Sequence, residues 1–152
     1  MTPSDTGPPR RHLVFRAAGL PLAVPVEAVA GVYEPVPLIA VPLPGPFVRG
    51  LFRMESGLVT AIDLAGACGR NEGADQRDCA RIVVLRRQGM ALGFAVESLE
   101  GLLPPSAVLP PDEGDPCTPP PFPDWLAGIL RPGPRRVLVL AVPRLFNLTR
   151  TA

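Results

Sequence analysis

The sequence predicts an all-β protein made of two small barrels that share one hydrophobic core, with short helical turns and a short C-terminal helix. Hydrophobic residues make up 47% of the 152-residue chain, which is typical of a packed globule. The 22 prolines disfavour long helices, because each proline removes a backbone hydrogen-bond donor. Short apolar runs with a period of two, separated by turns that contain glycine or proline, indicate strands instead.

The domain organisation follows from changes in composition along the chain. Residues 1–11 are polar and proline-rich and are predicted to form a disordered N-terminal arm. Residues 12–150 are predicted to form a single domain made of two barrel subdomains, since a chain of this size can bury one core. Within it, the proline-rich stretch at 104–124 is predicted to be a long loop.

The first half of the domain predicts two hairpins with an extended segment between them. Along residues 13–26, apolar residues alternate with polar or small ones on both sides of a turn at Ala18-Gly19. Residues 36–41 form an extended run bracketed by prolines. The stretch 47–64, FVRGLFRMESGLVTAIDL, predicts a second hairpin with a turn at Ser56-Gly57, followed by one helical turn from Asp63. That turn places on one apolar face, in facing pairs, Met54 with Val59 and Phe52 with Ala61.

The second half repeats this layout, so we expect the two barrels to be successive halves of the chain. Two strands flank a Gln88-Gly89 turn, and the segment EGLLPP, 100–105, continues as an extended run. Two further strands flank the turn at 132–134. The chain then predicts a short amphipathic helix that offers for packing Leu145, Phe146 and Leu148.

Charge and hydropathy exclude several classes of partner. The net charge of +1 provides no field to attract nucleic acid or an anionic membrane. No apolar run approaches the ~20 residues needed to span a bilayer, and the N-terminus is unlike a signal peptide. We therefore expect a cytoplasmic protein that inserts into no membrane, whose three cysteines, Cys68, Cys79 and Cys117, are free thiols.

The residues that catalysis needs are scarce. The chain has no lysine, and its single histidine, His12, lies at the edge of the predicted arm. No glycine-rich phosphate-binding motif is present, and the wide cysteine spacing does not fit a zinc site. We predict a protein that is not an enzyme and that has no cofactor or metal.

The order of five segments resembles the CheW-like family of chemotaxis coupling proteins, over residues 12–149. The segments are LVFRAAGLPLAVPVEAV, VPLPGPFVRGLF, VTAIDL, RIVVLRRQGMALGFAVESLEGLL and the terminal WLAGIL…VLVLAVPRLF. The resemblance implies two five-stranded SH3-like barrels around a shared core. It also implies a non-catalytic adaptor of a chemosensory array that binds the cytoplasmic tip of a chemoreceptor and the regulatory domain of a CheA-type histidine kinase. Other CheW-like proteins are further candidate partners.

The resemblance also assigns candidate residues. It places Val29 at a receptor-groove position of the first barrel, and Arg81 and Leu99 at groove positions of the second. The kinase-facing edge would comprise Val41, Pro42, Pro44 and Phe47. The alternative for the groove residues is an ordinary role in the barrel, and for the prolines a role in shaping the loop. An SH3-like interaction module outside chemosensing is the alternative for the whole chain.

One hairpin departs from the family pattern. Where family members commonly carry an arginine before the turn, this chain has Glu55, followed by Ser56. Many members carry an acidic residue at the position of Gly31, suited to pair with that arginine, so both charges of the pair are gone. This divergence predicts a weakened or lost kinase contact. The alternative is local drift in an ordinary coupler, with Arg53 and Glu55 paired on the exposed face.

Overall fold

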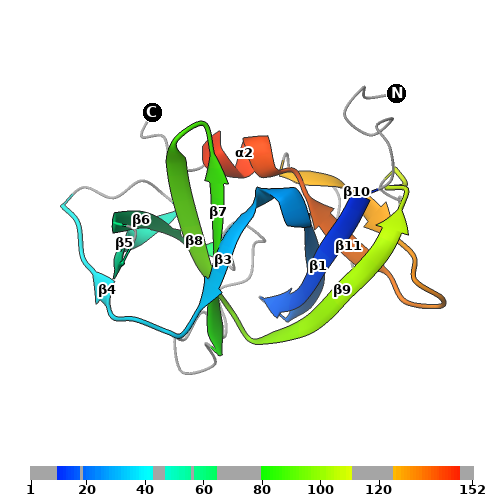
Figure 1. Ribbon diagram of the computed structural model, residues 1–152, viewed down its shortest axis with the longest axis horizontal. Coiled ribbons are helices and arrows are strands. Elements are labelled where there is room, and N and C mark those ends of the chain that lie inside the picture. The colour runs from blue at the N-terminus through cyan, green and yellow to red at the C-terminus, as the bar shows by residue number, and fades with distance from the viewer. Residues whose placement is uncertain are drawn as a thin grey trace.

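Two β-sheets, one from the ends of the chain and one from its middle, make up the fold of the computed structural model (Figure 1). The structure describes residues 10–17, 19–42, 47–55, 57–64, 80–110 and 125–147. In this part of the chain, no helix is long and apolar enough to cross a membrane.

The terminal barrel is a five-stranded sheet in the order β10-β11-β2-β1-β9. A backbone bridge between Leu109, beyond β9, and Ile129 of β10 joins the two ends of this order and closes the barrel. Its strands are β1 (Arg10–Ala17), β2 (Leu20–Pro25), β9 (Ser98–Ser106), β10 (Leu126–Leu130) and β11 (Val137–Leu140).

The central barrel is a six-stranded sheet in the order β3-β7-β8-β6-β5-β4. It has one strand more than predicted because the short β4 pairs with β5. Its strands are β3 (Val29–Tyr33), β4 (Leu38–Ile39), β5 (Val48–Met54), β6 (Gly57–Ile62), β7 (Arg81–Arg87) and β8 (Met90–Val96). A short 3-10 helix, η2 (Val26–Ala28), connects β2 of the terminal barrel to β3.

The prediction that the barrels are successive halves of the chain is wrong. The N-terminal hairpin β1–β2 pairs with β9 and β11 from the C-terminal part of the chain, and β3 to β8 form the other barrel between them. The chain passes from one barrel to the other at Glu97, which separates the end of β8 from the start of β9. Local patterns predict hairpins well but do not specify which hairpins share a sheet.

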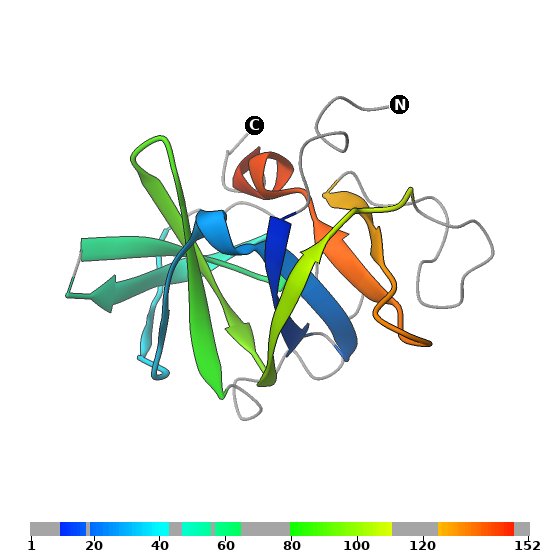
Figure 2. The same cartoon turned by 45° about the vertical axis from the view of Figure 1, so that its right-hand side comes forward.

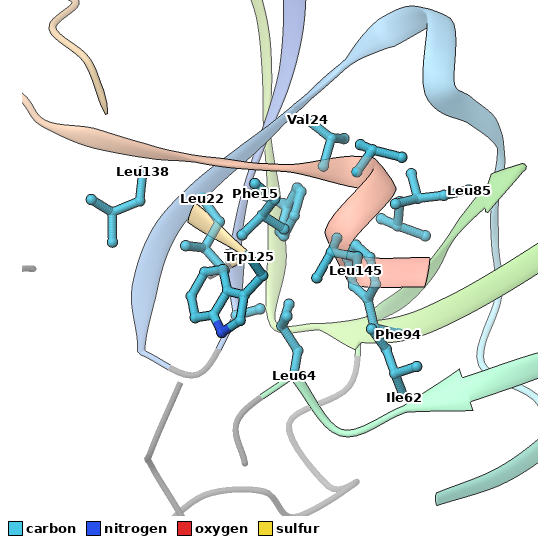
Figure 3. Close-up of a cluster of buried hydrophobic side chains, with 14 of the residues drawn as sticks. Phe15, Leu22, Val24, Ile62, Leu64, Leu85, Phe94, Trp125, Leu138 and Leu145 are labelled. Atoms are coloured by element: carbon cyan, nitrogen blue, oxygen red, sulfur yellow. The ribbon is translucent and has the colours of Figure 1, made fainter. Parts of the chain in front are cut away.

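Among the residues that the structure describes, three clusters of buried side chains form the core, one inside each barrel and one between them. The interior of the terminal barrel contains Val14, and that of the central barrel contains Phe52. The largest cluster, the shared core, lies between the barrels and takes side chains from both (Figure 3). Its labelled members are Phe15, Leu22, Val24, Ile62, Leu64, Leu85, Phe94, Trp125, Leu138 and Leu145.

Successive side chains of a strand point to opposite faces of its sheet, so neighbouring residues belong to different clusters. On β1, Val14 points into the terminal barrel and Phe15 into the shared core. On β7, Ile82 lies inside the central barrel and Val83 in the shared core. Strands buried on both faces read as continuous apolar runs, which explains the IVVL of β7.

The C-terminal helix α2 (Val142–Asn147) completes the shared core. Its buried residues are Val142, Leu145 and Phe146, as predicted for the last two. The backbone N–H of Ala141 donates to the carbonyl oxygen of Trp125 and fixes the entry to the helix. Leu148 lies outside the described residues, as do the three cysteines and most of the helical turn predicted from Asp63.

Of the three two-residue hairpin turns predicted, two match the structure. Ala17 pairs with Leu20, and Arg87 pairs with Met90, so both connections are two-residue turns. In the hairpin of β5 and β6, however, Met54 pairs with Gly57, so the turn lies one residue earlier than predicted. Phe52 therefore faces Val59 instead of Ala61. The predicted apolar face is kept, since the partner changes by two positions and side chains alternate with a period of two.

Two predicted boundaries differ from the structure. β1 begins at Arg10, inside the predicted arm 1–11, because Arg10 pairs with Ser106 at the end of β9. β9 in turn runs through Pro104 and Pro105, where the loop 104–124 was expected to begin. Proline is tolerated there because β9 pairs with β1 on one side and ends the order of its sheet, so its missing N–H groups cost no ladder bonds.

Burial makes His12 a pH-sensitive group in the terminal barrel. The side chain is only 2% exposed, and its Nδ1 lies 3.0 Å from the carbonyl oxygen of Arg10. Desolvation lowers the pKa of His12 below its ordinary 6.5, against the opposing effects of that hydrogen bond and of Glu27. The folded protein therefore holds the imidazole neutral, and the unfolded chain binds the proton more readily.

We expect the free energy of unfolding to fall as the pH drops below the ordinary histidine pKa of 6.5. The contribution of neutral His12 is complete above that pH and is lost below it, because only the unfolded chain gains a proton there. Urea denaturation between about pH 7.5 and about pH 5.5 measures the slope. His12→Leu, which removes the single histidine, should flatten the profile; an unchanged slope in this variant would contradict the assignment.

Candidate docking surface

A β-bulge in β3 places two valines on the face of the central barrel that looks toward the terminal barrel. Val29 pairs with Leu85 and Val32 pairs with Val83, and the register shifts at the residue that follows Val29. Leu85 and Val83 both belong to the shared core, and residues directly opposite each other share a face. Without the bulge, two residues three positions apart would lie on opposite faces. Val29 is half-buried against the core, and Val32 is exposed.

A second bulge, in β9, places two leucines on the face of the terminal barrel that looks toward the central barrel. Leu99 pairs with Phe15 and Leu102 with Leu13, and the register shifts between them, next to Gly101 with a φ of 119°. Phe15 belongs to the shared core and Leu13 packs against it, so both leucines lie on the face that looks toward the central barrel. Leu99 is 40% exposed and Leu102 58%.

These four side chains define what we call the inter-barrel surface: Val29, Val32, Leu99 and Leu102. In Figure 1, β3 and β9 lie on the near side of the molecule, one from each barrel. Each strand contributes an apolar pair by the same device, a bulge between residues three apart. Exposed apolar side chains gathered on one face are typical of a protein-docking site.

Arg81 lies at one end of this surface. It is the first residue of β7 and pairs with Val96, which belongs to the shared core, so it shares the face of Val83 and Leu85. Its Nη1 donates to the carbonyl oxygen of Ala80 at 2.7 Å and lies 3.4 Å from Oε2 of Glu34.

All three residues predicted for the receptor groove, Val29, Arg81 and Leu99, thus face the space between the barrels. The prediction of their barrels is wrong for Arg81, which lies in the central barrel with Val29, because β7 pairs with β3. Sequence reasoning missed Val32 and Leu102, since no local signal marks a bulge whose position depends on the pairing with a distant strand.

The residues predicted for the kinase-facing edge follow β4 and precede β5. Val41 and Phe47 are half-buried and Pro42 is exposed, whereas Pro44 lies outside the described residues. The carbonyl oxygen of Phe47 accepts a hydrogen bond from the N–H of Asp63 at 2.7 Å, which ties the start of β5 to the end of β6.

A second exposed apolar group lies on the outer face of the central barrel, toward the turn of the β5–β6 hairpin. Leu58 is 58% exposed and Met90 is 51% exposed, and Ile39 of β4, opposite Leu51 of β5, is also exposed. The parallel pairing of Thr60 with Leu92 brings Leu58 beside Met90. We call Ile39, Leu58 and Met90 the hairpin surface. In Figure 2 the hairpin reaches the left-hand end of the molecule, away from the terminal barrel.

Over nearly its whole length, the chain is similar to a known domain family. The profile of the CheW-like domain matches residues 11–150, nearly the whole chain. The chain belongs to the CheW-like family. Its members are non-catalytic scaffolds of chemotaxis signal transduction. No curated protein sequence matches the chain.

The CheW-like fold is also evident in a solved structure. The crystal structure of the scaffolding protein TtCheW from Thermoanaerobacter tengcongensis superposes with a TM-score of 0.71 at 20% sequence identity, covering 87% of this chain and 88% of that one. At this identity the likeness shows the fold alone, which confirms the prediction of two barrels around a shared core.

The hairpin that departs from the CheW-like pattern carries separate charges. Arg53 and Glu55 are both exposed, and in the described part of the chain neither makes an ion pair. The pairing between them that accompanied the alternative of local drift is therefore absent from the structure. Ser56 lies outside the described residues.

The space beside Gly31, where the family resemblance implies an acidic residue, is filled by the ring of Tyr33. The ring of Tyr33 folds back along β3, and a Cβ at Gly31 would lie 2.6 Å from the Tyr33 hydroxyl oxygen. Glycine on an edge strand is commonly covered by an aromatic side chain in this way. Two strands, β7 and β8, separate β3 from β6 in the sheet order, so Gly31 and Glu55 are not strand neighbours.

The described residues offer little for metal binding. In these parts of the chain, no three His, Cys, Asp or Glu side chains come together as metal ligands would. The inter-barrel surface and the hairpin surface are the candidate binding features of the described residues.

Proposed function

We propose that the protein is a non-catalytic adaptor of a bacterial chemosensory array, acting through its single domain, 12–150. The inter-barrel surface would bind the cytoplasmic signalling tip of a chemoreceptor, a helical hairpin. A CheA-type histidine kinase would be bound through the central barrel, with a contact weaker than that of an ordinary coupler. The protein would then work in the cytoplasm as an accessory component that links receptors within the array.

The pair of matched bulges in β3 and β9 is the main support for the proposed receptor contact. The bulges gather four apolar side chains from two barrels on one face. These side chains are partly or largely exposed, although folding alone would favour burying them. Helices dock on such surfaces by their apolar face, with contacts one turn apart. Arg81, at the end of the same surface, adds a charged group suited to fixing the register of a helix.

The weaker kinase contact rests on the hairpin. Glu55 stands where the family resemblance implies an arginine, so the charge at this turn is reversed. Gly31 stands where the resemblance implies the acidic residue suited to pair with that arginine. The hairpin surface nevertheless remains apolar and exposed, which supports a protein contact that is altered in charge and not abolished. A reversed rim charge weakens association chiefly by opposing the partner's field.

A paired calorimetric titration tests the proposal. The purified protein is titrated with the signalling tip of the cognate chemoreceptor and, separately, with the regulatory domain of the cognate kinase. We expect saturable binding of the tip, and kinase binding that Glu55→Arg strengthens by about tenfold. The matched control Arg53→Lys keeps the charge two positions away and should change neither affinity.

Each other outcome has a definite meaning. Tight kinase binding that Glu55→Arg leaves unchanged would show an ordinary coupler and contradict the weakened contact. Failure to bind either partner would contradict the adaptor role in chemosensing, and would favour an interaction module that shares only the fold.

A further inference from the structure

Arg81 ends a row of apolar side chains on the inter-barrel surface. On β7 the side chains of Arg81, Val83 and Leu85 share one face. Val32 and Val29 of β3 lie opposite Val83 and Leu85, so the apolar row continues along both strands away from the guanidinium. A ligand that covers Val29 and Val32 and extends along the strands toward Arg81 would meet a positive charge about 7 Å beyond the valines, two strand residues further on.

The contacts of Arg81 show how this guanidinium is held. Nη1 donates to the carbonyl oxygen of Ala80 at 2.7 Å, a bond within one strand end that orients the group. The same nitrogen lies 3.4 Å from Oε2 of Glu34, longer than the ~2.7–2.9 Å of a strong charge-assisted bond. The Glu34 side chain is 79% exposed and that of Arg81 44%. A carboxylate held this loosely on an exposed side chain can be exchanged for another.

We propose that Arg81 is a specificity-determining residue that selects a partner helix with an aspartate or glutamate beyond its apolar face, and that Glu34 occupies the guanidinium in the free protein. This rests on the proposed receptor contact, and it names the chemistry that the contact requires. The planar guanidinium binds a carboxylate through two parallel hydrogen bonds, which fixes the position of the helix along the row. A lysine or arginine at that helix position would be rejected by like charge.

The two members of the pair should act with opposite signs. In titrations with the purified chemoreceptor tip, Arg81→Glu should weaken binding by about tenfold, because it removes the attraction and adds a repulsion. Glu34→Gln should tighten binding about twofold, because it removes a carboxylate that competes for the guanidinium. A merely structural pair would give losses of affinity in both variants. Urea midpoints near that of the wild type would show that both variants are folded, as expected for exposed side chains.

A charge-swap scan identifies the matching residue. Each acidic residue of the tip is replaced by arginine in turn, and each variant tip is titrated against wild-type protein and Arg81→Glu. We expect one tip variant to lose affinity for the wild type and regain it with Arg81→Glu.

The control within the chain is Arg53→Glu, the same change on the outer face of the same barrel. It should leave tip binding unaltered. If the wild type binds the tip and Arg81→Glu binds it equally well, or Glu34→Gln binds it more weakly, this inference alone would be overturned. A wild-type protein that binds no tip would overturn it together with the proposed receptor contact.

Discussion

Replacing Leu102 by glutamate should weaken binding of the chemoreceptor tip by about thirtyfold or more while leaving the fold intact. Leu102 is 58% exposed, so the folded protein tolerates a charged side chain there. In the complex, the same carboxylate would be buried against the apolar face of a helix, and apolar anchors at the centre of an interface contribute ~2 kcal/mol or more. Calorimetry on the purified variant measures the loss.

Leu58 provides a matched control for this experiment. It is the same residue type with the same 58% exposure, but it belongs to the hairpin surface on the outer face of the central barrel. Leu58→Glu should therefore leave tip binding unchanged and reduce binding of the kinase regulatory domain. If Leu58→Glu abolished tip binding and Leu102→Glu did not, the assignment of the two surfaces would be reversed.

Phe15→Ala should lower the free energy of unfolding by about 3–5 kcal/mol, the cost of removing a buried aromatic side chain and leaving a cavity. Phe15 comes from the terminal barrel, is fully buried, and its ring centroid lies 5.3 Å from that of Phe94 of the central barrel. The shared core therefore loses a contact that joins both barrels. Urea denaturation of the wild type and the variant measures the difference.

The same experiment tests whether the barrels unfold together. Because the largest buried cluster belongs to both, we expect one transition for the wild type by fluorescence of Trp125 and by circular dichroism. Leu58→Ala, at an exposed position, should change stability by less than ~0.5 kcal/mol and serves as the control. Two separate transitions, or a small effect of Phe15→Ala, would contradict a core that holds the barrels together.

The hairpins could be predicted because their signals are local. Alternating apolar residues around Gln88-Gly89 specify both the strands and the turn, and the positive φ of 51° and 79° at these residues fits a two-residue turn. The turn at Glu55 was predicted one residue late because Gly57 was placed in the turn. With a φ of 123°, Gly57 instead opens β6 and pairs with Met54.

The pairing of distant strands could not be predicted from such signals. Nothing in the composition of β1 indicates that it pairs with β9, and the bulges of β3 and β9 exist only relative to their partners. The sequence therefore does not mark Val32 and Leu102 as surface residues, whereas the family resemblance does point to Val29 and Leu99. The strand registers of β3 with β7 and of β9 with β1 explain why Val29 and Leu99 each share a face with their partner in the inter-barrel surface.

In the proposed adaptor, the receptor tip docks on the inter-barrel surface. Methyl NMR on the intact protein, with the purified chemoreceptor tip added stepwise, tests it most directly. We expect saturable shifts of the methyl signals of Val29, Val32, Leu99 and Leu102, with no shift of the methyl signals of Ile39, Leu58 and Met90. Shifts confined to the hairpin surface, with the inter-barrel methyl groups unmoved, would contradict it.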